Sequence, residues 1–379
     1  MIFYIILKKN FNLNQDSTKE ILEKIPYLNE KIYKVKLEEK HLKIFTKFIK
    51  QSEKIRIIKK INLLIKNLHN LQDITKREII FENKNSIIIN KFNAYDSLIK
   101  SKNIIKLFDG VYALQKNFLE LKNQFDKKFK DYFKKNGYQE ANYSNLLEVD
   151  SLIENSYVHS FPNHCLFVSN VRRNNSNLSK ISKTNIKNKK KIKNQLDNSQ
   201  YILSPTVCYN CFETQKNQII NTNLKITSIA KCNRYEGLNY KTLERLKVYS
   251  MREFMFFGDK LFVKREIDKG LKYFIKILNH LKLKFRVSTA SDPFFLQSLK
   301  NKKIFQLSNN LKYELELFLP YENKWIAVGS FNNHLNTLTS KYKISKKGGK
   351  TCFSGCIGIG YERFLYAFYS QKKKFRIKP

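Results

Sequence analysis

A glycine-rich segment near the end of the chain is the first feature that points to a ligand. The chain has 11 glycines, and five of them lie within residues 348–360, just before Arg363. Glycines let a ligand approach the backbone closely, and a helix N-terminus followed by an arginine favours an anionic phosphate group. The segment lacks the Gly-Lys-Ser/Thr of a P-loop and the third glycine of a dinucleotide fingerprint. Taken alone, it is also typical of a tight turn that packs a strand against a helix.

Paired charges in a predicted strand–loop–strand segment are the second candidate. Arg234 is followed by Glu236, and Arg252 and Glu253 lie in the next predicted strand. An arginine in such a hairpin can bind an α-phosphate through two parallel hydrogen bonds, and Glu236 can accept a hydrogen bond from an adenine amino group. Paired charges are also ordinary on a sheet surface, so both interpretations stay open at this point.

The cysteines offer a possible metal site. They are scattered through a long chain, which argues against a disulfide scaffold and for a reducing compartment. By spacing alone, Cys208 and Cys211 form the first candidate ligand pair, but no second Cys-x-x-Cys or His pair accompanies them. The six cysteines are Cys165, Cys208, Cys211, Cys232, Cys352 and Cys356.

The charge of the chain indicates an acidic partner. The formal net charge is +40 and the isoelectric point is near 9.8, which favours nucleic acid, an anionic membrane surface or an acidic protein. The chain is also rich in Lys, Asn, Ile, Phe and Tyr, whose codons are AT-rich, so genome composition is a second origin for the charge. No apolar run approaches the roughly 18 residues that span a bilayer. We therefore expect a cytoplasmic protein with no membrane partner.

Two regions, residues 1–105 and residues 172–200, differ in composition from the rest of the chain. Residues 1–105 are basic and contain no catalytic constellation. They predict an accessory domain with a buried first strand, one or two amphipathic helices over residues 33–69 and two short strands over 76–92. The alternative is an arm that binds nucleic acid. Residues 172–200 have few large apolar side chains, so they predict a basic surface loop or disordered insertion. Such a loop is either simply solvated or captures a partner by charge.

Residues 106–379 predict an α+β domain. A helix is expected over residues 112–137 with Gly137 as its stop, and residues 204–211 are expected to be a turn or strand edge. Two strands flank the polar loop between Glu236 and Arg245, and a helix follows from Asp259. A strand pair with a turn at residues 320–323 and a closing helix from Tyr361 complete a mostly antiparallel sheet flanked by helices.

The two candidate segments together resemble motifs 2 and 3 of class II aminoacyl-tRNA synthetases. More specifically, the chain resembles the amino acid:[carrier protein] ligases, which are truncated relatives of the zinc-dependent seryl-tRNA synthetases of methanogenic archaea. The resemblance covers roughly residues 107–370 and occurs in the order of the family. The matching strings are "SFPN" (160–163), "LSPTVCY" (203–209), "RLKVYSMREFMFFG" (245–258), "ASDPFF" (290–295), "KYEL" (312–315), "SFNNH" (330–334) and "GCIGIGYER" (355–363).

The resemblance implies a zinc site. The family holds zinc with Cys, Glu and Cys and keeps one position open for the α-amino group of the substrate, and the matching residues here are Cys208, Glu253 and Cys356. Thiolate and carboxylate ligands suit zinc, and three protein ligands are typical of a catalytic site. By this resemblance Cys211 is not a metal ligand, and the other cysteines are expected to pack as small apolar groups.

The resemblance also implies an ATP site. Arg234 and Arg363 would be catalytic, the first between the substrate carboxylate and the α-phosphate, the second over the adenine ring and toward the γ-phosphate. Glu236 would recognise adenine by accepting a hydrogen bond from its amino group, and Arg245 is a further candidate for binding phosphate. The glycines up to Gly360 would clear space for ATP. The residues expected to line the ATP and Mg²⁺ side are Glu314, Ser330 and Asn332.

The implied activity is conversion of a small amino acid to an aminoacyl-adenylate, followed by transfer to the phosphopantetheine thiol of an acidic carrier protein. The alternatives are a seryl-type synthetase that charges tRNA, with the basic N-terminal region gripping it, and a non-catalytic paralogue that binds RNA or a protein. A homodimer is expected from the fold class.

The sequence departs from the family in several places. Ala327 stands where many synthetases have Glu, the loop after Glu236 lacks a proline, and the acidic and glycine residues usual after His334 are absent. Residues 1–105 and the insertion have no counterpart in the compact ligases.

Overall fold

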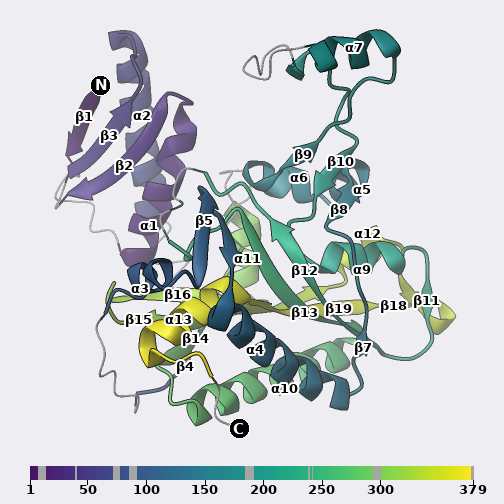
Figure 1. Cartoon of the computed structure of the whole chain (residues 1–379). Coiled ribbons are helices and arrows are strands. Elements are labelled where there is room, and N and C mark those ends of the chain that lie inside the picture. Colours follow the sequence, from purple (N-terminus) through teal and green to yellow (C-terminus); the bar gives the residue numbers. More distant parts are fainter. Residues whose placement is uncertain are drawn as a thin grey trace.

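The computed structural model describes residues 1–6, 14–38, 41–70, 77–84, 92–183, 192–237, 240, 242–292 and 300–376. These residues form an N-terminal lobe, up to residue 70, and a main lobe, from residue 77 onward (Figure 1). Each lobe has hydrophobic clusters of its own. Among the described residues, every helix is too short or too polar to cross a lipid bilayer.

A three-stranded antiparallel sheet and two helices build the N-terminal lobe. The strand order is β1-β3-β2, and the inner face of the sheet packs on the helices through aliphatic residues such as Ile44, Ile57 and Ile61. The elements are β1 (Ile2–Ile6), α1 (Gln15–Lys24), the 3₁₀ helix η1 (Ile25–Leu28), β2 (Ile32–Glu38), β3 (His41–Thr46) and α2 (Gln51–His69).

This lobe corrects one prediction from the sequence. A helix was expected from Tyr33 onward, but residues 32–38 and 41–46 form strands β2 and β3, and α2 is the helical part of this segment. Alternate residues of β3 are buried, which is the period of two that belongs to a strand. The first strand is confirmed by β1, whose alternate residues are buried.

An eight-stranded sheet forms the centre of the main lobe and confirms the α+β class. Neighbouring strands run antiparallel, except that the short edge strand β7 lies parallel to β12. In sheet order the strands are β4 (Ile79–Glu82), β14 (Phe285–Thr289), β15 (Lys312–Leu319), β16 (Lys324–Leu335), β19 (Phe353–Gly360), β13 (Val248–Gly258), β12 (Leu224–Asn233) and β7 (Gln139–Glu140).

Three helices cover one face of this sheet and leave the other face for the site (Figure 1). The phenylalanine stripe of α4 makes much of the contact, and Phe133 stacks on Phe254 of β13 with ring centroids 3.6 Å apart. On the same face Arg252 is buried and binds Asp126 of α4, with 2.9 Å between Nη2 and Oδ2. The helices are α4 (Lys116–Lys135), α10 (Lys260–His280) and α13 (Tyr361–Lys372).

The smaller elements of the main lobe surround the second face and the edges of the sheet. The two-stranded ladder β5-β6 and two three-stranded sheets stand apart from the central sheet. These elements are α3 (Ala94–Lys100), β5 (Ile104–Phe108), β6 (Val111–Leu114), β8 (Leu146–Glu148), α5 (Val149–Glu154), α6 (Tyr157–Ser160), η2 (Pro162–His164), β9 (Phe167–Val168), α7 (Asn175–Lys183), β10 (Tyr201–Leu203), α9 (Cys208–Thr214), β11 (Ile219–Ile220), α11 (Lys300–Ser308), α12 (Thr337–Lys341), β17 (Ser345–Lys346), η4 (Lys347–Gly349) and β18 (Lys350–Thr351).

Most of the predicted elements of this lobe are confirmed, and two predictions are wrong in part. The segment expected to be a turn or strand edge continues into helix α9, because Cys208, Cys211 and Phe212 fall on one side of a helical turn and are buried together. The insertion was expected to lack structure, but Asn175–Lys183 forms helix α7, which projects from the lobe (Figure 1). The second strand expected over residues 85–91 lies outside the described residues.

Candidate active site and metal centre

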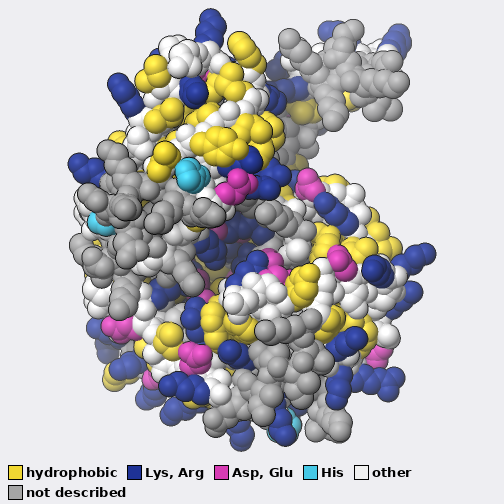
Figure 2. Space-filling view, turned by 90° about the vertical axis from the view of Figure 1, so that its left-hand side faces the viewer, with side chains coloured by type: hydrophobic (Ala, Val, Ile, Leu, Met, Phe, Trp, Pro, Cys, Tyr) yellow, Lys and Arg dark blue, Asp and Glu magenta, His cyan; other side chains and the backbone are white. Residues whose placement is uncertain are grey.

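A cavity of about 690 Å³ lies on the face of the sheet that is free of α4, α10 and α13. Figure 2 shows the molecule hollowed below the N-terminal lobe, with Lys and Arg side chains inside the hollow. The lining residues come from alternate positions of β13, β15 and β19 and from a longer stretch of β16, and α9 and α11 also contribute. The cavity is lined by ten of the eleven predicted site residues: Cys208, Arg234, Glu236, Glu253, Glu314, Ser330, Asn332, Cys356, Gly360 and Arg363.

The register of the sheet explains how these residues meet. Glu314, Ser330, Gly358 and Glu253 are successive cross-strand partners on β15, β16, β19 and β13. They therefore form one row of side chains on the cavity face. A Cβ atom at Gly358 would lie 3.3 Å from the Met251 sulfur and 3.5 Å from Cγ of Glu253, so glycine leaves room beside Glu253.

Three of the predicted residues converge at one end of the cavity, which we call the metal end. A carboxylate oxygen of Glu253 and the sulfur atoms of Cys208 and Cys356 all lie within 4.8 Å of one another, and all three residues are buried. They come from β13, α9 and β19 and are far apart in the sequence. Cys211 is not part of this cluster; it is buried in the apolar cluster around Phe212.

The Glu253 carboxylate at the metal end is only partly hydrogen-bonded by the described residues. Glu253 accepts a hydrogen bond from the Val207 amide through Oε1, at 3.3 Å, but its buried Oε2 has no hydrogen-bond partner. Burial raises the pKa of the Glu253 carboxyl to about 8, and the nearby Cys356 adds to the effect. An unpaired carboxylate oxygen beside two thiols is a donor set that fits zinc.

Asn332 and His334 surround the Cys356 sulfur. The Asn332 amide donates to it at 3.4 Å, and Nε2 of His334 lies 3.6 Å from it. The pKa of the Cys356 thiol lies well below its usual range, mainly because the Cys208 thiol hydrogen-bonds to it, with the His334 imidazole adding to the effect. Both contacts restrict the position of the Cys356 sulfur.

Sequence reasoning did not place either residue beside the Cys356 sulfur. Asn332 was assigned to the ATP and Mg²⁺ side, and His334 was not assigned to the site. The spacing of Ser330, Asn332 and His334 is the signal that would have found them, because every second residue of a strand faces the same side.

The opposite part of the cavity, which we call the nucleotide end, holds Arg234, Glu236, Glu314 and Arg363. Nε of Arg234 donates to the Pro205 carbonyl at 2.9 Å, and its guanidinium lies over the Tyr249 ring, 5.6 Å from the centroid. These contacts hold the arginine with its remaining donors available to a ligand.

The carboxylates of the nucleotide end are paired with arginines. Glu236 lies 3.1 Å from Arg245, and Glu314 lies 2.9 Å from Arg77. Burial would raise the pKa of Glu236, but the charges of Arg245 and Arg363 outweigh burial and hold that pKa below its ordinary value. Burial would also raise the pKa of Glu314, but Arg77, Lys312 and other nearby cations together hold that pKa below its ordinary value.

The N-terminal lobe reaches this end of the cavity. Arg245 does not line the cavity; it forms a second ion pair, with Glu23 of α1. Glu20 of the same helix accepts from Lys303 of α11 at 2.9 Å. The predicted phosphate ligand Arg245 is therefore held between carboxylates of two lobes.

Comparison with known proteins identifies the family of the core domain. Residues 190–372 match the protein family described as "tRNA synthetase class II core domain (G, H, P, S and T)". This range includes the central strands and the three residues of the metal end. The chain contains a class II aminoacyl-tRNA synthetase core domain.

Relatives of this core domain include type-2 serine–tRNA ligases of methanogenic archaea. The Methanopyrus kandleri protein is 24% identical over 256 residues, which cover 63% of this chain and 49% of the relative. The Methanocaldococcus jannaschii protein is 26% identical over 249 residues, with 63% and 48% covered. Amino acid–[acyl-carrier-protein] ligase 1 of Bradyrhizobium diazoefficiens is 30% identical over 176 residues, with 46% and 53% covered. The chain thus spans about half the length of the curated relatives it matches.

Solved structures show the same fold. Seryl-tRNA synthetase of M. kandleri, in a crystal structure with A. aeolicus tRNASec, has a TM-score of 0.71 at 18% identity and covers 98% of this chain and 74% of its own. The cytoplasmic serine–tRNA ligase of Naegleria fowleri, solved with AMP, has a TM-score of 0.61 at 12% identity, with 86% and 80% covered. The first match leaves out only 2% of this chain, so the likeness in fold extends over the N-terminal lobe.

Proposed function

We propose that the protein activates a small amino acid with ATP and transfers it to the phosphopantetheine thiol of an acidic carrier protein. The observation that carries the proposal is the cavity itself, because its metal end and its nucleotide end border the same space. An amine held at one end and a triphosphate at the other would bring a carboxylate and an α-phosphate together.

Cys208, Glu253 and Cys356 would hold zinc, which when bound would supply an open position for the amino group of the substrate. Asn332 and His334 would orient the Cys356 thiolate through the contacts described above. This arrangement selects a free α-amino acid rather than one already joined through its nitrogen.

Arg234 and Arg363 would act on the reacting phosphate. The substrate carboxylate oxygen forms a bond to the α-phosphorus, and the bond to the bridging oxygen breaks as pyrophosphate leaves. Arg234 would stabilise the charge that develops on the α-phosphate, and Arg363, at the start of α13, would bind the triphosphate tail over the adenine. Glu236 would accept from the adenine amino group, and Glu314 and Ser330 would line the Mg²⁺ side.

In the second half-reaction, the acceptor thiolate attacks the acyl carbon and AMP leaves. A carrier protein is favoured by the relative that is 30% identical, which is named as an acyl-carrier-protein ligase, and by the charge of +40, which complements an acidic partner. The second candidate acceptor is tRNA. It is favoured by the relatives named serine–tRNA ligases and by the fold of the N-terminal lobe, which matches a synthetase solved with a tRNA.

Exchange of labelled pyrophosphate into ATP tests the activation step. We expect exchange that depends on one of glycine, alanine or serine, and absence of exchange with every amino acid would refute the proposal. The acceptor is then identified by incubating the enzyme with labelled amino acid, a phosphopantetheinylated carrier protein and tRNA. Label on the carrier supports the first choice, provided that a carrier without its arm stays unlabelled, and label on tRNA supports the second.

A further inference from the structure

Helix α1 of the N-terminal lobe contacts two segments that border the cavity. Glu23 forms the ion pair with Arg245 described above, and Glu20, three residues earlier on the same helix, lies 2.9 Å from the ammonium of Lys303 on α11. Arg245 also lies 3.1 Å from Glu236 of the nucleotide end, and other residues of α11 line the cavity. The two glutamates therefore join α1 to two borders of the site that come from the main lobe.

A third contact comes from the 3₁₀ helix η1, which follows α1. The Tyr27 hydroxyl lies so close to Gly237 that a Cβ atom on this glycine would be 2.8 Å from it. Gly237 comes directly after Glu236 and has a φ of +75°. Glycine adopts this conformation without strain and leaves room for the ring. Tyr27 thus packs against the segment that carries Glu236.

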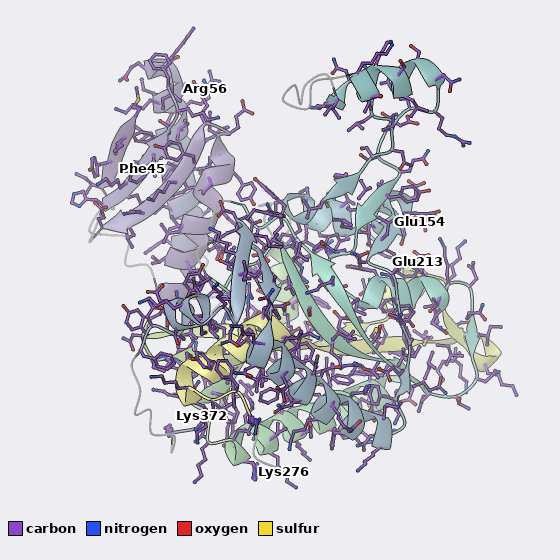
Figure 3. The ribbon with its side chains drawn as sticks, viewed as in Figure 1. Phe45, Arg56, Glu154, Glu213, Lys276 and Lys372 are labelled. Carbon is purple, nitrogen blue, oxygen red and sulfur yellow. The ribbon has the colours of Figure 1, made fainter. Side chains whose placement is uncertain are left out.

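The contacts that hold α1 against the main lobe are mainly polar. Each hydrophobic cluster in the described part of the chain lies within a single lobe. Figure 1 shows α1 at the end of the N-terminal lobe nearest the main lobe, and in Figure 3 the labelled Phe45 of β3 and Arg56 of α2 lie farther from it. Lobes joined in this way are expected to move relative to each other, because a large apolar interface is what prevents such motion.

The glutamates of α1 compete with phosphate for the same cations. Burial would raise the pKa of Glu20, but Lys24 and Lys303 hold that pKa below its ordinary value, so Glu20 is charged in this contact. Carboxylates and phosphates both accept charge-assisted hydrogen bonds from ammonium and guanidinium groups. A triphosphate at the nucleotide end would also repel Glu20 and Glu23.

We propose that α1 is an autoinhibitory clasp on the nucleotide end. In the closed arrangement Glu20 and Glu23 occupy Lys303 and Arg245, and binding of ATP separates these pairs, so that the N-terminal lobe opens. The effect is reciprocal, because any change that favours the open lobe also strengthens the binding of ATP. The inference rests on the ATP site of the proposed function, but not on the identity of the amino acid or of the acceptor.

Cross-linking of the full chain with a water-soluble carbodiimide tests the clasp, because this reagent joins a carboxylate to an amine in direct contact. We expect peptide mass spectrometry to find a cross-link between Glu20 and Lys303 in the ligand-free chain. Its yield should fall about 5-fold or more when Mg²⁺ is added with an ATP analogue that has a methylene group between the α- and β-phosphates. Glu53 and Lys31, 2.8 Å apart within the N-terminal lobe, are the internal control and should cross-link equally in both samples.

The double variant Glu20→Gln/Glu23→Gln should open the clasp in the absence of ATP. Because two partly exposed ion pairs are lost, the Kd of the same analogue, measured by calorimetry, should fall by about 2- to 25-fold. Glu53→Gln is the matched control, since it removes a carboxylate that pairs with Lys31 inside the lobe. It should keep the Kd of the unchanged chain.

Three results would overturn the inference. The first is the absence of the Glu20–Lys303 cross-link from the ligand-free chain, the second is an equal yield with and without the analogue, and the third is an unchanged or higher Kd in the double variant. Failure of the proposed function gives a different result. A cross-link that the analogue suppresses, in a chain that shows no pyrophosphate exchange with any amino acid, would support the clasp and refute the activity.

Discussion

At the metal end of the cavity a buried carboxylate oxygen of Glu253 has no hydrogen-bond partner in the described part of the chain, whereas at the nucleotide end Glu236 and Glu314 are paired with arginines. The pKa values move in opposite directions for this reason: that of Glu253 is raised to about 8, and those of the other two are lowered. Buried carboxylates near one cavity thus differ in whether an arginine of the chain pairs with them.

The two ends of the cavity therefore differ in the source of positive charge that we expect for their carboxylates. At the metal end, the proposed function calls for a bound cation that would stabilise the donors. At the nucleotide end, arginines of the chain itself balance the carboxylates. One of them, Arg77, lies before the core domain in the sequence. Arg245 is shared with Glu23 of the N-terminal lobe. We therefore expect variants of the two ends to fail in different ways.

The largest effect is expected from Cys356→Ser. Loss of a direct ligand should abolish zinc binding and reduce pyrophosphate exchange by more than the roughly 10- to 100-fold that loss of an outer partner of the metal produces. Zinc content and exchange are measured together. Cys352→Ser is the control, since Cys352 is also buried but does not line the cavity. Normal exchange by Cys356→Ser would show that the metal end plays no part in activation.

The next effect is expected from Arg234→Ala. Removing the donor at the α-phosphate should reduce the rate of exchange by about 10²- to 10³-fold and should leave zinc content unchanged, because the arginine belongs to the other end. Arg265→Ala, on the exposed side of α10, is the control. Loss of zinc from Arg234→Ala would contradict the expectation that the two ends of the cavity bind their ligands independently.

The smallest effect is expected from Glu23→Gln. Because Glu23 is one of two carboxylates that hold Arg245, its neutralisation should free the guanidinium for phosphate and lower the KM for ATP. A partly exposed pair is worth about 0.2–1 kcal/mol, so the expected change is about 1.4- to 5-fold. Glu53→Gln, which breaks a pair with Lys31 inside the N-terminal lobe, should not alter this KM. A higher KM in Glu23→Gln would contradict the competition between the lobes.

Much of the main lobe could be predicted from the sequence because its signals are local. The phenylalanines of α4 repeat at helical spacing, and the strands from Leu224 to Gly258 are long and apolar. The N-terminal strands were misassigned because their apolar residues are interleaved with Lys and Glu, which also suits an amphipathic helix. The error thus arose where local patterns conflict.

The site could be predicted only in part. Spacing alone favoured Cys208 with Cys211, and the true neighbours of Cys208 were suggested by the family resemblance, since residues as distant as Glu253 and Cys356 share no local pattern. The pairing of Arg245 with Glu23 had no signal at all, because it depends on how the two lobes pack.

X-ray absorption at the zinc edge of the purified, unchelated full chain is the most direct measurement of whether Cys208, Glu253 and Cys356 share one ion. We predict one zinc per chain with two sulfur neighbours and a carboxylate oxygen. Protein without zinc, or zinc surrounded by four sulfurs, would contradict this assignment and the function proposed from it.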